Sequence, residues 1–200
     1  MAVEAQLYKQ CSRFYPFILG SQPLRPIDLA AFYAAIANEG ARPVPHVIAS
    51  IEQQGREIYK ADPNASAWIG ANDRASFYQL KSMLQGVLSR GTARSAGHLS
   101  PYVAGKTGTT DNELDAWFVG FTNDVTIAIW VGYDNADGNR KTLGRGQTGG
   151  RVALPMFEPV LQSVWALHSP KTALAGPSKE AMRDLVAVRV APSVIGVLDT

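Results

Sequence analysis

Three β-prone runs follow one another closely in the second half of the chain and constrain its fold more than any other feature. They cover residues 103–110, 116–122 and 125–133, and only Asn123 and Asp124, a pair suited to a tight hairpin turn, separate the last two. Such short connections predict antiparallel pairing. Both faces of the third run are largely apolar, which predicts a sheet that is covered on both sides.

Helical spacing of apolar residues predicts the elements that cover this sheet. Residues 26–39 start with a proline and carry an apolar face up to Gly40, a typical C-terminal cap. Residues 72–90 form a second candidate helix with Asn72 as its N-cap, and residues 155–167 form a third, amphipathic one. We therefore expect an α+β fold, an antiparallel sheet covered by helices.

Two other segments are expected at the periphery. Residues 44–60 contain two β-prone stretches around a polar Gln-Gln-Gly sequence, which predicts a hairpin. Residues 169–179 are rich in Ser, Pro, Ala and Gly, as is typical of a linker. The expected organisation is one domain over residues 1–168, followed over residues 169–200 by a linker and a tail that either adds an edge strand or begins another domain.

Composition excludes several classes of function. The 200 residues are 46% hydrophobic and 18% charged, which suits one globular domain with a core. Its 19 basic and 17 acidic residues are mixed along the chain, so no basic stripe predicts binding to nucleic acid. No apolar run approaches the roughly 20 residues of a membrane-spanning helix. The histidines are scattered without metal-ligand spacing, so we expect a soluble fragment that needs neither metal nor cofactor.

Residues 106–110 read Lys-Thr-Gly-Thr-Thr and lie in the first of the three predicted strands. Lys-Thr-Gly is the third motif of the serine β-lactamases and penicillin-binding proteins, beside Ser-x-x-Lys and a Ser-x-Asn motif. In this sequence no serine has a lysine three residues later, and none has an asparagine two residues later. The chain therefore carries the strand motif without the motif of the nucleophile.

Further blocks of sequence surround this motif in a specific order. They lie at residues 19–21, 30–40, 86–88 with 91–93, 104–121, 130–134 and 148–151. Together, from about residue 19 to about residue 168, they resemble the second half of the transpeptidase domain of class A (bifunctional) penicillin-binding proteins. The resemblance implies a partial β-lactamase/transpeptidase-like fold and a fragment of a peptidoglycan D,D-transpeptidase.

The same resemblance implies roles for the strand residues. Lys106 lends positive charge near the nucleophile and the substrate carboxylate, and the backbone N–H of Thr109 donates to the oxyanion; both are supporting catalytic residues. Substrate binding is implied for Thr107, Gly108, Thr109 and Thr110. Side chains alternate along a strand, so Lys106 and Gly108 should point one way and Thr107 and Thr109 the other. On a flat strand the hydroxyls and the ammonium cannot all face one side.

For the whole protein, the resemblance implies serine acyl transfer that cross-links the cell wall, and binding of peptidoglycan stem peptides and β-lactams. It also implies an upstream glycosyltransferase domain and an anchor in the bacterial cytoplasmic membrane, with this domain on the outer (periplasmic) side. We expect the chain to be inactive alone and to form oligomers through an uncovered apolar surface. The alternative is a folded, non-catalytic peptidoglycan-binding or interaction module. The sequence alone does not distinguish a transpeptidase from a carboxypeptidase.

Other signals are weaker. Ala-Gly-Lys-Thr at residues 104–107 resembles the end of a phosphate-binding loop, but Ser100 stands where that motif needs glycine. Gly144, Gly146 and Gly149 match a dinucleotide-binding pattern only by letter. We expect Asp115 to cap or pair at the start of a strand. Residues 148–151 either place a loop near the cleft or provide the approach to a helix.

Overall fold

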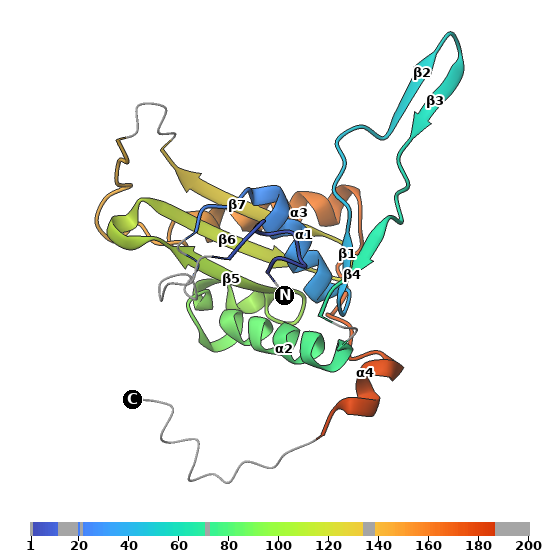
Figure 1. Cartoon of the computed structure of the whole chain (residues 1–200). Helices are drawn as coiled ribbons and strands as arrows, with labels where there is room; N and C mark the ends of the chain where they lie inside the picture. The colour runs from blue at the N-terminus through green and yellow to red at the C-terminus, as the bar shows by residue number, and fades with distance from the viewer. Residues whose placement is uncertain (1, 12–19, 21, 71–72, 134–138, 187–200) are drawn as a thin grey trace.

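The computed structural model describes residues 2–11, 20, 22–70, 73–133 and 139–186. Its helices and strands follow in chain order as α1 (Pro26–Ala37), β1 (Ala41–Pro43), β2 (Ser50–Gln53), β3 (Arg56–Lys60), β4 (Ser66–Trp68), α2 (Arg74–Arg90), η3 (Arg94–Leu99), β5 (Ala104–Thr109), η4 (Asp111–Glu113), β6 (Asp115–Phe121), β7 (Thr126–Gly132), α3 (Ala153–Leu167) and α4 (Lys179–Asp184), where η marks a 3-10 helix. The α+β class predicted from the sequence is confirmed (Figure 1).

The central sheet has the strand order β5-β6-β7, and both pairs are antiparallel. At the turn between β6 and β7, the Thr122 N–H donates to the Val125 carbonyl at 2.9 Å. The Thr122 hydroxyl accepts from the N–H groups of Asp124 and Val125, at 3.1 and 3.2 Å. The predicted strands and the tight connection at Asn123 and Asp124 are confirmed.

Helix α3 covers one face of this sheet. Its buried Phe157 meets Phe118 of β6 edge to face, with ring centroids 4.7 Å apart. Ile127 and Ile129 of β7 pack against the same cluster, which also contains Leu161 of α3. These contacts use the apolar face that the sequence pattern predicted for residues 155–167.

Helix α1 lies across the other face of the sheet, against β6 and β7 (Figure 1). Ile36 of α1 joins Phe77 of α2 and Phe121 of β6 in a second buried cluster. The helix ends at Ala37, two residues before the predicted end, and Gly40 follows with φ of 105°. That left-handed conformation is the one a C-terminal glycine cap supplies, so the predicted cap is confirmed.

Helix α2 runs beside β5 and ends at Arg90, as predicted. The prediction of Asn72 as its N-cap is wrong, because Asp73 caps the helix: its carboxylate accepts from the Ser76 N–H at 3.0 Å. Asp and Asn are equivalent caps by type, so two adjacent candidates could not be separated by sequence. Asn72 itself lies outside the described residues.

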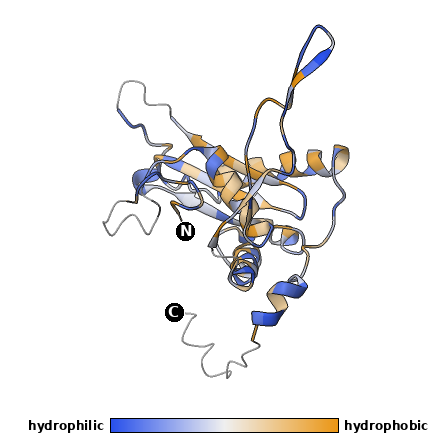
Figure 2. Cartoon of the chain, turned by 45° about the vertical axis from the view of Figure 1, so that its right-hand side comes forward, coloured by the Kyte–Doolittle hydropathy of each residue, from blue (hydrophilic) through white to orange (hydrophobic). Residues whose placement is uncertain are grey.

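The predicted hairpin is formed by β2 and β3, which stand away from the body of the molecule (Figure 1). Gln54 and Gly55 make its two-residue turn, with φ of 51° and 75°. Every residue of both strands is exposed. The most hydrophobic stretches gather instead around the sheet and its flanking helices (Figure 2). The hairpin is therefore peripheral, as expected.

Residues 169–178 form no helix or strand, as a linker would, but they lie against the body. The Asn123 side chain donates to the Ala173 carbonyl at 2.8 Å and accepts from the Ala175 N–H at 2.9 Å. The Leu174 N–H donates to the Pro101 carbonyl at 2.9 Å. The prediction of an unpacked linker is therefore wrong, because these hydrogen bonds attach the segment to the domain. The boundary at residue 168 stays a prediction, and the expected edge strand falls mostly on residues 187–200, outside the described residues.

Candidate active site

The Lys-Thr-Gly sequence lies on β5, at one edge of the three-stranded sheet. The register pairs Lys106 with Val119 and Gly108 with Trp117, and it pairs Trp117 with Trp130 on β7. Residues that are directly opposite in antiparallel strands share a face. These five residues therefore lie on the same side of the sheet.

The neighbouring threonines point to the opposite side. The Thr107 hydroxyl shares a hydrogen bond of 2.5 Å with the Thr92 hydroxyl, and Thr107 is buried. The Thr109 hydroxyl accepts from the Gly149 N–H at 3.0 Å. The alternation expected along this strand is confirmed, and both hydroxyls have partners away from the Lys106 face.

The outer edge of β5 brings two further polar groups together. The Thr110 N–H donates to the Asp115 carbonyl at 3.2 Å and so points toward β6. Because successive N–H groups of a strand point to alternate sides, the Thr109 N–H points outward, away from β6. The Lys106 ammonium donates to the Thr107 carbonyl at 2.9 Å, and by the same alternation that carbonyl also points outward. The ammonium and the Thr109 N–H therefore lie at the same edge.

A pocket of about 730 Å³ opens on the Lys106 face. Leu29 and Tyr33 of α1 line one side of it, and Trp117 and Trp130 line the side of the sheet. Burial raises the pKa of the Tyr33 phenol to about 12, so this group stays neutral at physiological pH. The pocket thus offers apolar walls around a cationic strand residue, the usual composition of a site for a small ligand.

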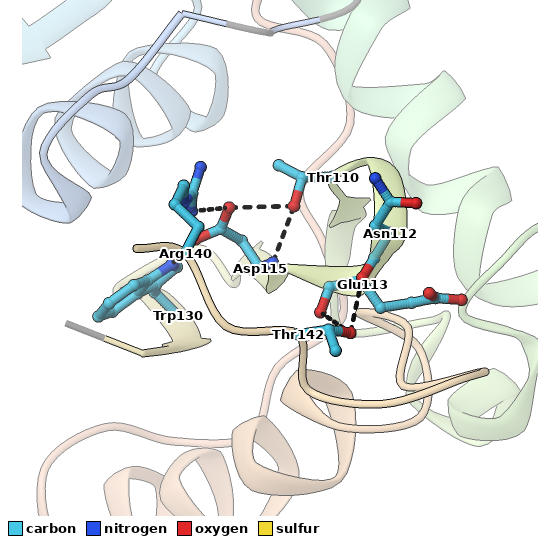
Figure 3. Close-up of polar contacts among 7 residues, drawn as sticks. All are labelled: Thr110, Asn112, Glu113, Asp115, Trp130, Arg140 and Thr142. Carbon is cyan, nitrogen blue, oxygen red and sulfur yellow. Dashed lines mark hydrogen bonds and ion pairs between the residues drawn. The ribbon is translucent and has the colours of Figure 1, made fainter. Parts of the chain in front are cut away.

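Asp115, at the start of β6, organises the rim of this pocket (Figure 3). Its carboxylate accepts from the Thr110 hydroxyl at 3.0 Å, from the Trp130 indole N–H at 3.0 Å and from the Arg140 guanidinium at 2.5 Å. Its own N–H donates to the Thr110 hydroxyl at 2.8 Å. The expectation that Asp115 pairs at a strand start is confirmed. The hydroxyl of Thr110, which the resemblance implied for substrate binding, already makes two hydrogen bonds with this aspartate.

The glycine pair at residues 149–150 contacts β5 directly. A Cβ on Gly149 would lie 2.2 Å from the Trp117 carbonyl oxygen and 2.5 Å from the Gly108 carbonyl oxygen. Only a glycine allows so close an approach of two backbones. The segment lies against the Lys-Thr-Gly strand on the face opposite Lys106, where the Gly149 N–H meets the Thr109 hydroxyl, and none of its residues lines the pocket. It leads into α3, so the interpretation as an approach to a helix is confirmed.

The structure brings four of the five predicted site residues, Lys106, Thr107, Gly108 and Thr110, to the pocket, and it places Thr109 at the strand edge. Sequence reasoning missed Arg140, because an arginine in a polar, glycine-containing stretch carries no motif of its own.

Within the described ranges, no group of three or more His, Cys, Asp and Glu side chains is placed to hold a metal ion. No helix in that part of the chain is long and apolar enough to cross a membrane.

Comparison with known protein families identifies the family of the chain that carries this strand. The penicillin binding protein transpeptidase domain matches residues 23–162, more than half of the chain. The chain belongs to this family. The resemblance noted from the Lys-Thr-Gly strand and its neighbouring blocks is thereby confirmed.

Two curated relatives of this penicillin-binding domain are penicillin-binding proteins 1A. The protein of Rickettsia bellii is 35% identical over 179 residues, which cover 79% of this chain and 22% of the relative. That of Aquifex aeolicus is 36% identical over 155 residues, covering 78% and 20%. The chain spans about a fifth of the length of these relatives.

A solved structure supports the same fold. Penicillin-binding protein 1A from Haemophilus influenzae superimposes with a TM-score of 0.69 at 22% identity, over 86% of this chain and 30% of that chain. At this identity the likeness bears on the fold alone. The partial transpeptidase-like architecture expected from the sequence is confirmed.

Proposed function

We propose that this chain supplies the carboxylate-binding and oxyanion-stabilising strand of a D,D-transpeptidase that cross-links peptidoglycan stem peptides. One observation carries the proposal: the Lys106 ammonium lies at the outer edge of β5, where the Thr109 N–H also points. A donor and a fixed positive charge at one edge suit a carbonyl that gains negative charge during acyl transfer. Family membership supplies the substrate class.

In the proposed reaction, a serine hydroxyl attacks the carbonyl carbon of the penultimate residue of a stem peptide and gives its proton to a base. The Thr109 N–H stabilises the resulting oxyanion, and Lys106 attracts the terminal carboxylate of the peptide. Collapse of the intermediate breaks the peptide bond, releases the last residue and leaves an ester on the serine. The base gives its proton to the amine of the released residue. An amine from a second stem peptide then attacks this ester, which forms the cross-linking amide, breaks the bond between the acyl carbon and the serine oxygen, and returns the amine's proton to the serine hydroxyl through the base.

The nucleophile of this reaction is proposed to come from residues outside these 200, because no serine here has a lysine three residues later. The same observation favours a second candidate, a non-catalytic module that binds peptidoglycan. Titration with an acetylated D-alanyl-D-alanine peptide distinguishes the two candidates. A binding module should show saturable binding, whereas a transpeptidase fragment that needs the rest of its domain should show none.

Incubation with a fluorescent penicillin tests the proposal. The chain alone should give no labelled band on a denaturing gel, because acylation requires an activated serine. A chimera in which this chain follows, in frame, the Ser-x-x-Lys and Ser-x-Asn segment of a class A relative should be labelled. Labelling of the chain alone that one serine substitution abolishes, or an unlabelled but folded chimera, would contradict the proposal.

The whole protein is proposed to be anchored in the bacterial cytoplasmic membrane with this domain on the outer side, where stem peptides and β-lactams reach it. Family membership supports this placement. Its test is protease digestion of intact spheroplasts, which should cleave the domain. Protection of the domain until the membrane is lysed would contradict the placement.

The chain alone is proposed to self-associate. The outer edge of β7 pairs with no strand among the described residues, and Trp130 and Tyr133 at this end of the sheet are 40% and 50% exposed. Exposed strand edges and apolar patches both promote association. Light scattering after gel filtration should therefore show dimers or larger species. A monomer that binds no hydrophobic dye is the opposite result.

A further inference from the structure

Helix α2 runs beside β5 (Figure 1), and a pair of hydroxyl groups joins the C-terminal end of the helix to this strand. The Thr92 and Thr107 hydroxyls share a hydrogen bond of 2.5 Å. Thr107 is buried, whereas Thr92 is exposed. Within the described part of the chain, neither hydroxyl has another hydrogen-bond partner. Loss of the Thr92 hydroxyl would therefore leave the Thr107 hydroxyl without its partner.

The backbone on either side of Thr92 is fixed. The N–H groups of Gly91 and Ala93 both donate to the Val87 carbonyl, at 3.1 and 3.2 Å. Gly91 leaves no room for a side chain, because a Cβ there would lie 2.8 Å from the Val87 Cα. Ala93 is fully buried. Thr92 thus lies between two anchored neighbours, which direct its exposed side chain toward β5.

Thr107 connects this hydroxyl pair to the outer edge of the strand. Its carbonyl accepts from the Lys106 ammonium at 2.9 Å and points outward, away from β6. The same residue is held through its side chain by Thr92 and holds Lys106 through its carbonyl. Because β5 has β6 as its one neighbour in the described sheet, contacts on its far face help to set how the strand is rotated about its own axis.

We propose that Thr92 is a positioning residue for acyl transfer: through Thr107, it orients the carbonyl that keeps the Lys106 ammonium at the strand edge. This inference rests on the proposed function, because it takes that edge as the place where the oxyanion forms. Thr92 itself touches neither the stem peptide nor the nucleophile in this scheme. The competing interpretation is that the hydroxyl pair only stabilises the packing of α2 on β5.

Acylation of the chimera by a fluorescent penicillin distinguishes these interpretations. Thr92→Val keeps the shape of the side chain and removes its hydroxyl, so the second-order rate should fall about fivefold, the scale of one neutral hydrogen bond. Thr92→Ser restores a hydroxyl and should recover the wild-type rate within about twofold, a small change on the same scale. In a Thr107→Val background the bond is already absent, so Thr92→Val should have no further effect.

Thr172→Val is the matched control, because it makes the same change and also removes one hydrogen bond, with the Asn123 side chain at 3.0 Å. Thr172 is exposed and does not line the pocket, so this variant should acylate at the wild-type rate. Urea denaturation of the 200-residue chain should give similar midpoints for Thr92→Val and Thr172→Val. Should Thr92→Val fail to fold, Thr92→Ala removes the same hydroxyl with a smaller side chain and should show the same loss of rate.

Four results would overturn the inference: a wild-type rate for Thr92→Val, no recovery in Thr92→Ser, a further loss in the Thr107→Val background, or an equal loss in Thr172→Val. Failure of the proposed function looks different, because Lys106→Ala itself would then acylate at the wild-type rate. A slow Lys106→Ala together with an unchanged Thr92→Val would remove the inference and leave the proposed function in place.

Discussion

Gly149→Ala is expected to lower the free energy of unfolding by about 3 kcal/mol, the upper part of the range for overpacking. The added Cβ would lie 2.2 Å from the Trp117 carbonyl oxygen and 2.5 Å from the Gly108 carbonyl oxygen. Both atoms belong to the hydrogen-bonded backbones of β5 and β6, so neither moves as a side chain would. The Gly149 N–H also donates to the Thr109 hydroxyl, and relief of the clash would stretch this bond.

Urea denaturation measures this loss against Gly176→Ala. A Cβ on Gly176 would meet no atom within 4 Å, and this glycine has no left-handed φ. The control therefore makes the same chemical change in open space and should shift stability by less than about 1 kcal/mol. Equal midpoints for the two variants would show that residues 148–151 do not press on the Lys-Thr-Gly strand.

Local patterns were sufficient to predict the parts of the fold that depend on sequence neighbours. The strand at residues 125–133 and its turn at Asn123 and Asp124 followed from β-propensity and turn chemistry. Helix 155–167 followed from its periodicity, because its apolar face packs on the sheet. The pattern that predicts each of these elements lies within the element itself or its adjoining turn, inside a window of roughly 11–18 residues.

Features that depend on contacts between distant residues could not be predicted in this way. The segment 169–178 has the composition of a linker, yet Asn123, some 50 residues earlier, fixes it to the body. Arg140 joins the pocket only because Asp115, 25 residues before it, supplies a buried carboxylate. A single sequence contains both partners but no pattern that pairs them, so such contacts appear only in three dimensions.

The Lys-Thr-Gly strand has one feature that the sequence predicted and one that only the structure resolves. Alternation predicted that Thr107 and Thr109 lie opposite Lys106, and the structure confirms it. The predicted difficulty, that hydroxyls and ammonium cannot share one face, has a simple resolution. The lysine reaches around the strand edge to the Thr107 carbonyl, so the charge and the backbone donor lie at the edge, while the hydroxyls have partners on the opposite face.

Lys106→Ala is accordingly expected to slow penicillin acylation at least about tenfold more than Thr109→Ala does, a difference of about 1.4 kcal/mol in the barrier. The lysine change removes a fixed charge from the edge at which the oxyanion is proposed to form, and charge-assisted contacts are roughly twice as strong as neutral ones. The threonine change keeps the backbone N–H and removes a hydroxyl that contacts Gly149 on the opposite face. Its effect should come only through a small displacement of the strand.

The measurement is the second-order acylation rate of the chimera described above, carrying each substitution, after circular dichroism has shown that the fold is unchanged. Lys141→Ala is the matched control, because Lys141 is exposed and does not line the pocket, and it should acylate at the wild-type rate. Equal rates for the wild type and Lys106→Ala would remove this strand from the active site. A Thr109→Ala rate as low as that of Lys106→Ala would instead show that the hydroxyl matters as much as the charge, since the backbone donor survives in both variants.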